Sequence, residues 1–365
     1  MQLKKTILKQ GFTLIEMLVV LGIVVTLVAL LVPRIRTIND QRGVREASRI
    51  VGSKFATASQ RAVIDGIAGV RIERNPNFFI NEGLLSGFQY ASTRISVLRE
   101  VPNYTGDTDD ARTLVLTPGN EPRVTIPLPI EQTTLQIIRA GDSISLNDSS
   151  IRFRIDRAEM LNSNEMQLTL DSSGYIPLPS VPAGEVGVPF VIHRLPRVLR
   201  SSQADLPGNF IIDLRYSGCL TNATSVSGGR INVFEYEPAG DAGNFVNSDI
   251  DVIFDDSGGI ETIVYMKEIN GMLESESFIP QGPVNLFIVE APDNPTTELT
   301  LADGNALWVN CSNVTGSTNV GNHFPDGSIL PTANDLAALS ANDLAAFSAI
   351  IDNARSGSNT ASANQ

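Results

Sequence analysis

Glu16 is the residue of this sequence whose position most restricts its chemistry, because it is the one charged residue in the apolar run 12–32. A carboxylate among apolar side chains is costly to leave unpaired, so by default it has a function and a cationic partner. A helix over this run would be about 30 Å long, which matches the hydrocarbon core of a bilayer. We therefore expect a transmembrane helix over 12–32, with Lys4, Lys5 and Lys9 on the cytoplasmic side.

Other residues that could carry chemistry are few and scattered. The two histidines, His193 and His323, lie in no HExxH motif, and neither accompanies a GxSxG sequence or a plausible cysteine nucleophile. Packing or surface hydrogen bonding explains His193 better than catalysis does. No GxxxxGK[ST] or GxGxxG sequence supports nucleotide binding. We expect neither an enzyme nor a bound cofactor.

Two groups of aspartates could in principle bind calcium. They are Asp107, Asp109 and Asp110, and Asp249, Asp251, Asp255 and Asp256. Neither group has the spacing of an EF-hand loop, so solvated turns are the favoured interpretation and calcium is the alternative. We predict no metal site.

The two cysteines, Cys219 and Cys311, form no CxxC pair, which argues against a structural zinc site. They could form one disulfide in an exported protein, or they could be two small buried residues. The sequence does not decide between these alternatives, because a bridge requires Cα atoms within about 7 Å.

Composition excludes some classes of protein. The chain has 365 residues, of which 42% are hydrophobic, so it can bury a sizeable core. It carries 27 basic and 40 acidic residues, a net charge of −13. Binding to a nucleic-acid backbone needs clustered Lys and Arg, so no nucleic-acid partner is expected.

The sequence Gly11-Phe12-Thr13-Leu14-Ile15-Glu16, after a short basic leader, resembles the prepilin-peptidase site of type IV pilins and type II secretion pseudopilins. The resemblance implies that residues 1–11 are a cleaved leader, with the cut between Gly11 and Phe12 and N-methylation of Phe12. It also implies that Glu16 pairs with the amino group of Phe12 on a neighbouring subunit and sets the register of assembly. The alternative is an interfacial Glu16 with no partner.

The same resemblance implies partners and a location. The partners would be other pilin or pseudopilin subunits through the N-terminal helix, the prepilin peptidase, an inner-membrane assembly platform and membrane lipid. The chain would cross the inner membrane once, with a cytoplasmic N terminus and a periplasmic head, and would enter an extracytoplasmic filament on assembly. Gly22 and Pro33 would kink the helix or let it melt on assembly, although both residues are also tolerated in ordinary membrane helices.

A second, amphipathic part of the helix is predicted over 33–66, and Gly66 is its plausible C-cap. Apolar residues recur there at helical spacing. They are Ile35, Ile38, Val44, Ala47, Val51, Phe55, Ala58 and Ala62.

Strand-like runs and turns dominate the rest of the chain. We assign 67–100 and 205–330 to a β head, 101–204 to an inserted β unit (a small barrel or sandwich), 331–355 to a C-terminal helix and 356–365 to a flexible tail. Residues 250–254, followed by an Asp-Gly-rich turn, predict a β-hairpin. Residues 206–218 and 249–263 are weakly similar to H-type minor pseudopilins.

The expected fold class is therefore α+β, with a long N-terminal transmembrane and amphipathic helix packed on a mainly antiparallel β head that contains an inserted small β unit. The expected function is structural, as a minor subunit of a type II secretion pseudopilus or a type IV pilus-like filament. The alternative is a membrane-anchored extracytoplasmic binding or adhesion module that uses the inserted β unit.

Overall fold

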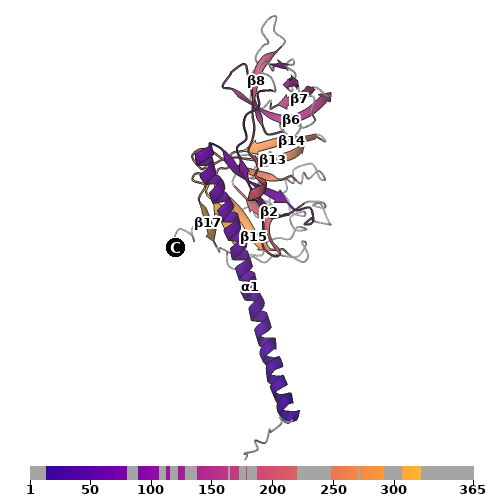
Figure 1. The fold of residues 1–365 in the computed structure, drawn as a ribbon, viewed down its shortest axis with the longest axis vertical. Coiled ribbons are helices and arrows are strands. Elements are labelled where there is room, and N and C mark those ends of the chain that lie inside the picture. The colour runs from indigo at the N-terminus through magenta and orange to yellow at the C-terminus, as the bar shows by residue number, and fades with distance from the viewer. Residues whose placement is uncertain are drawn as a thin grey trace, which may run out of the picture.

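The structure, a computed structural model, describes residues 14–79, 89–106, 112–115, 122–127, 138–162, 165–171, 178, 187–219, 248–269, 272–291 and 306–321. One long helix, α1 (Leu14–Asp65), runs along a head of antiparallel strands and continues well beyond it (Figure 1). A β-barrel lies at the end of the head that is opposite to the projecting part of α1.

Helix α1 ends where the sequence predicts a C-cap. Gly66 has a φ of 91°, and its N–H donates to the Ala62 carbonyl oxygen at 2.8 Å. A positive φ at this position is easily adopted only by glycine, so the helix stops and the chain turns into the first strand. Gly22 and Pro33 both lie inside α1.

The head is one large antiparallel sheet in which strands from both ends of the chain alternate. Its main path runs in the order β14-β13-β12-β1-β2-β11-β15-β16-β17, and the short strands β9 and β10 pair with β2. The strands of the main path are β1 (Ala68–Arg74), β2 (Ala91–Arg99), β11 (Phe210–Gly218), β12 (Ile250–Phe254), β13 (Ile260–Ile269), β14 (Met272–Phe278), β15 (Val284–Glu290), β16 (Leu307–Cys311) and β17 (Thr318–Gly321). Strands β9 (Arg197–Val198) and β10 (Ala204–Asp205) flank the 3-10 helix η3 (Arg200–Ser202).

The predicted hairpin is confirmed, because β12 pairs with β13 across the turn at residues 255–259. Strand β12 also pairs with β1, which brings residue Ala68 opposite Phe254. The sheet therefore joins segments about 180 residues apart in the chain.

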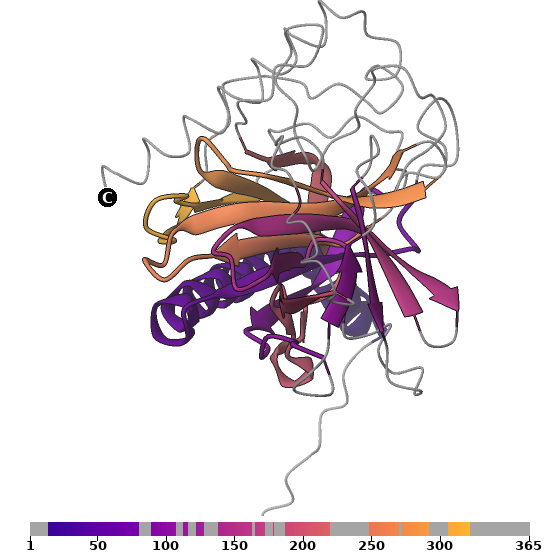
Figure 2. The same ribbon diagram turned by 90° about the horizontal axis from the view of Figure 1, so that it is seen from above.

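The main core lies between α1 and one face of this sheet (Figure 2). The buried helix residues follow the predicted spacing, and three of them are small alanines, which allow the helix to approach the strands closely. They are Val44, Ala47, Val51, Phe55, Ala58 and Ala62. Phe55 contacts Phe254 edge to face, with ring centroids 6.1 Å apart.

A closed barrel, in the strand order β3-β4-β7-β6-β5-β8, is inserted between β2 and β11 of the sheet. Its strands are β3 (Arg112–Val115), β4 (Arg123–Pro127), β5 (Ser143–Leu146), β6 (Arg152–Asn162), β7 (Glu165–Leu170) and β8 (Val188–His193). The barrel has its own buried core, separate from the core under α1. Closure removes the free strand edges that a small open sheet would expose.

The expected transmembrane segment over 12–32 is wrong for the part of the chain that the structure describes, where no helix is long and apolar enough to cross a membrane. The expected inner-membrane location and the transmembrane part of the pilin resemblance are corrected by the same finding.

The expected α+β fold class is corrected as well. Among the described residues, the molecule consists mainly of antiparallel β-sheet with one α-helix and one 3-10 helix, and no helix among them spans a membrane. Several predicted features lie outside the described residues. These are the leader 1–11 with its cleavage and methylation site at Gly11 and Phe12, His323, Asp107, Asp109, Asp110, the helix 331–355 and the tail 356–365.

Candidate functional surfaces

The most unusual surface of the molecule is the part of α1 that projects beyond the head, which we call the projecting half (residues 14–29). Its large apolar side chains are exposed, from 48% for Val24 to 84% for Leu14. In Figure 1 this part of the helix leaves the head and no described strand lies beside it.

A row of exposed apolar side chains of this extent marks a surface that another molecule covers. The projecting half is apolar around most of the helix rather than along one stripe, since exposed Leu, Ile, Met and Val occur at nearly every position from Leu14 to Val28. A helix that is apolar all round is stable when it is enclosed on several sides. The geometry therefore fits a bundle of helices better than a single flat partner.

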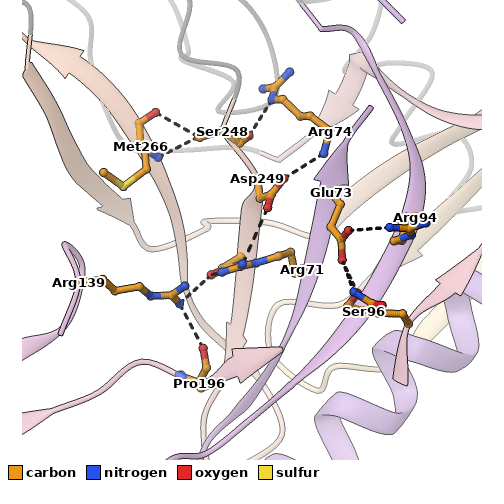
Figure 3. Close-up of polar contacts among 12 residues, drawn as sticks. Arg71, Glu73, Arg74, Arg94, Ser96, Arg139, Pro196, Ser248, Asp249 and Met266 are labelled. Atoms are coloured by element: carbon orange, nitrogen blue, oxygen red, sulfur yellow. Dashed lines mark hydrogen bonds and ion pairs between the residues drawn. The ribbon is translucent and has the colours of Figure 1, made fainter. Parts of the chain in front are cut away.

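A second candidate site lies where the barrel meets the sheet (Figure 3). Arg71 on β1 holds Asp251 on β12 through two hydrogen bonds, Nε to Oδ1 and Nη2 to Oδ2, each 2.7 Å long. Arg139, which precedes β5, donates to the same Asp251 carboxylate at 3.2 Å and to the Pro196 carbonyl oxygen at 3.2 Å. One buried carboxylate thus connects an arginine of the sheet with an arginine of the barrel.

Asp142 is the second carboxylate at this junction, and it is fully buried. It accepts a hydrogen bond of 2.7 Å from Arg197 Nη2 and further bonds from the backbone N–H groups of Leu195, at 2.8 Å, and Arg139, at 3.0 Å. Burial raises the pKa of Asp142 to about 6, although these backbone hydrogen bonds oppose the shift.

The arginines at the junction are also perturbed by burial. Burial lowers the pKa of Arg139, partly offset by the charge of Asp251. Burial by itself would lower the pKa of Arg71 too, but its hydrogen bonds and charge interaction with Asp251 outweigh that effect and raise it. Each buried charge is therefore matched by an opposite one.

A cavity of about 240 Å³ lies beside these residues, lined by Arg71, Arg139, Asp249, Tyr265 and Met266 among others. Its charged groups already pair with one another, and no cysteine, serine–histidine pair or metal-ligand cluster occurs among its lining residues. The arrangement can fix the barrel on the sheet, and Arg154 of β6 adds a hydrogen bond of 2.6 Å to Ser277 of β14. We interpret the junction as a rigid joint, which positions the barrel away from α1.

The structure separates the residues that the sequence singled out. Glu16 lies in α1, within the projecting half. Cys219 and Cys311 are both buried thiols of the main core, which agrees with the second alternative and not with a disulfide. His193 Nε2 lies 3.1 Å from Ser145 Oγ on the neighbouring strand, and burial lowers its pKa. This part-buried hydrogen bond joins the neighbouring strands β5 and β8.

The aspartates of the second acidic group have two different roles. Asp255 accepts hydrogen bonds from the backbone N–H of Ser257 and Gly259, as expected of a turn residue. Asp251, in contrast, is buried and paired with Arg71, so the interpretation of it as a solvated turn residue is wrong. Among the described residues, no group of His, Cys, Asp and Glu could hold a metal ion.

Sequence reasoning missed Arg71, Arg139, Asp142 and Arg197 at the joint. Their partners are distant in the chain, and Arg71 and Asp251 are 180 residues apart. The one available signal was Asp251, a charged residue in the middle of the apolar run 250–254. An acid at such a position is expected to have a buried cationic partner.

Comparisons with known proteins add no relative: no family model, no curated protein and no solved structure matches this chain. The resemblance of residues 11–16 to a prepilin-peptidase site stays a prediction.

Proposed function

We propose that this chain is a structural subunit of a pseudopilus-like or pilus-like filament, in which the projecting halves of many copies pack against one another. The observation that carries the proposal is the exposed apolar surface of residues 14–29. Because the head leaves this surface open, burial there must come from other molecules, and each large apolar side chain that becomes buried contributes about 1.5–3 kcal/mol.

Two further features support assembly rather than catalysis. Glu16 is an acid within the projecting half, where it would need a cationic partner once neighbouring helices exclude water. The resemblance of residues 11–16 suggests that this partner is the amino group of Phe12 on a neighbour, created by cleavage after Gly11. The joint between barrel and sheet is a structural ion-pair network in which each charge has an opposite partner.

The proposal is tested by placing charges on the projecting half of the full chain. Leu21→Glu combined with Val24→Glu should abolish filaments sheared from cells, because both side chains would be enclosed in the bundle. The matched control is Ile151→Glu combined with Leu161→Glu, two exposed apolar side chains on the barrel. The control variant should assemble normally. If the Leu21→Glu and Val24→Glu variant also assembles as well as the unchanged chain, the proposed function is wrong.

The processing step has its own test. Mass spectrometry of the mature chain should find an N terminus at Phe12 that carries a methyl group, and Glu16→Ala should greatly reduce incorporation into filaments. An intact Met1 in assembled material would contradict the processing that we propose.

A further inference from the structure

The cavity where the barrel meets the sheet is lined by charged groups that do not use all of their hydrogen-bonding capacity. It lies on the face of the sheet opposite to α1, because Ile250 and Val252 of β12 pack in the core under the helix and Asp251 between them points the other way. Its volume of about 240 Å³ is below the roughly 300–1,000 Å³ of sites for drug-sized ligands. The cavity therefore suits a small molecule.

Two carboxylates line the cavity, and they differ in how well they are paired. Asp251 accepts three hydrogen bonds, two from Arg71 and one from Arg139. Asp249 Oδ1 accepts one bond of 3.2 Å from the Arg74 backbone N–H, while Oδ2 lies 3.8 Å from Arg71 Nη1, beyond hydrogen-bond distance. Within the described ranges Asp249 Oδ2 accepts no hydrogen bond, and this side chain is 41% exposed. It is the carboxylate that a cationic group can reach.

The arginines that line the cavity have unused donors. Arg71 holds Asp251 through Nε and Nη2, and Arg139 holds Asp251 and the Pro196 carbonyl oxygen through Nη2 alone. In the part of the chain that the structure describes, Arg71 Nη1 and the Nε and Nη1 groups of Arg139 donate no hydrogen bond. Two guanidinium groups thus share one fully paired carboxylate, and their remaining N–H groups can bind an anionic group.

Burial acts on both of the incompletely paired charges. It raises the pKa of Asp249, although the charge of Arg71 opposes the shift. It lowers the pKa of Arg139, although the charge of Asp251 opposes that shift. In each case the surroundings disfavour the charged form of the side chain. A ligand with one group of each sign would compensate both charges, whereas an anion alone would be repelled by Asp249 and a cation alone by the arginines.

Asp249 is held in place by its neighbours. Ser248 Oγ donates to the Met266 carbonyl oxygen at 3.2 Å, and Met266 N–H donates to Ser248 Oγ at 3.0 Å. Arg74 Nε donates to the Ser248 carbonyl oxygen at 2.8 Å (Figure 3). These bonds fix the start of β12 beside β13, so the carboxylate is pre-organised for binding. Leu195 and Val264 add apolar side chains to the lining.

We propose that this cavity binds a free α-amino acid with an apolar side chain. The ammonium group contacts Asp249 Oδ2, the carboxylate contacts Arg139 and Arg71 Nη1, and the side chain lies toward Leu195 and Val264. An α-amino acid carries its two opposite charges on one carbon atom, which matches an acid and a base whose atoms are 3.8 Å apart. A residue within a peptide has lost both charges to amide bonds, so the free amino acid is the ligand that the cavity selects.

Isothermal titration calorimetry of the purified full chain tests the ligand class with leucine as the probe. Leucine should bind with a Kd below about 1 mM. Two analogues of similar shape each lack one charge: 4-methylpentanoate has no amine, and 3-methylbutylamine has no carboxylate. Each should bind at least about tenfold more weakly than leucine, because one charge-assisted contact is lost and one charge of the cavity stays unpaired.

Asp249→Asn tests the assigned position of the ammonium group. The amide keeps an acceptor oxygen but removes the charge, so leucine should bind at least about tenfold more weakly. The same variant should bind 4-methylpentanoate at least as well as the unchanged chain does, because the repulsion from Asp249 is gone. Asp205→Asn is the matched control, an acid of an exposed ion pair outside the cavity, and should bind leucine normally. Thermal unfolding without ligand checks that both variants are folded.

The inference is supported if leucine binds saturably, both analogues bind more weakly, and folded Asp249→Asn loses affinity for leucine but not for 4-methylpentanoate. It is overturned if leucine shows no saturable binding up to about 10 mM, if either analogue binds as well as leucine, or if folded Asp249→Asn binds leucine normally. The cavity is remote from the projecting half, and none of these outcomes depends on filaments, so the proposed function is tested separately.

Discussion

The two halves of α1 are parts of one continuous helix, yet they have opposite surroundings. In the head-packed half, six residues at helical spacing from Val44 to Ala62 are buried against the sheet. In the projecting half, every described large apolar side chain from Leu14 to Val28 is at least 48% exposed. The comparison teaches that an apolar helix surface has two physical uses here, one within the molecule and one left open for other molecules.

The first test of this contrast is a large-to-small substitution in each half. Phe55→Ala removes a buried ring that contacts Phe254 edge to face and should lower the free energy of unfolding of the head by about 4 kcal/mol. Val24→Ala should change it by less than about 0.5 kcal/mol, because that side chain is 48% exposed on the projecting half. Chemical denaturation of the purified chain measures both, and a similar loss in the two variants would contradict the contrast.

The second prediction extends the comparison to the barrel joint. Asp251→Asn leaves two arginines without their carboxylate and should destabilise the protein by about 3 kcal/mol. Arg94 and Asp205 form an exposed pair with a similar distance of 2.7 Å, so Asp205→Asn should cost below about 1 kcal/mol. Thermal unfolding compares the two. Equal effects would mean that burial does not strengthen the joint.

The third prediction uses thiol reactivity. Cys311 lies in the core under the head-packed half, and burial raises its pKa to about 12. The reactive thiolate is therefore nearly absent at pH 8 in the folded protein, while an unfolded thiol has an ordinary pKa near 8.5. Alkylation by iodoacetamide, followed by mass spectrometry, should be at least about a hundredfold slower at Cys311 than at a cysteine introduced as Val24→Cys. Comparable rates would show that the core under α1 is open.

The pKa of Cys311 also fixes the sign of a pH effect. Because the folded-state pKa exceeds the unfolded value, this thiol contributes its full stabilisation below about pH 8.5 and progressively less as the pH rises toward 12. In Cys311→Ala, the free energy of unfolding should therefore fall less steeply with pH above about pH 8.5.

The fourth and smallest effect concerns the end of α1. Gly66→Ala places a Cβ on a residue with a φ of 91° and should cost about 1 kcal/mol. Gly66→Asn should cost less, since asparagine tolerates the left-handed region. Denaturation midpoints rank the stability of the unchanged chain and of the two variants. An alanine variant as stable as the asparagine variant would argue against this C-cap.

Local pattern predicted the parts of the fold that depend on neighbouring residues. The spacing of Val44, Ala47, Val51 and Phe55 identified the buried face of α1, and the run 250–254 followed by an Asp-Gly turn identified the β12–β13 hairpin. Gly66 was placed correctly for the same reason, because a C-cap is a property of a few adjacent residues.

Long-range pairing was not predictable in this way. Nothing near Arg71 in the sequence indicates Asp251, and nothing near Asp142 indicates Arg197, 55 residues later. The apolar composition and length of the run 12–32, together with the lysines before it, predicted a membrane span, and the described helix does not meet that criterion. Composition alone does not say what covers an apolar helix.

The central claim is that copies of this chain meet through their projecting halves, and a cysteine comparison tests it most directly. Single cysteines at Val20 and Leu27 of the full chain are treated with a flexible bis-maleimide, alongside a control cysteine at Leu161, an equally apolar and exposed barrel residue. We predict covalent dimers from the two helix positions and monomers from Leu161. Monomers at Val20 and Leu27, with the head folded, would contradict the account.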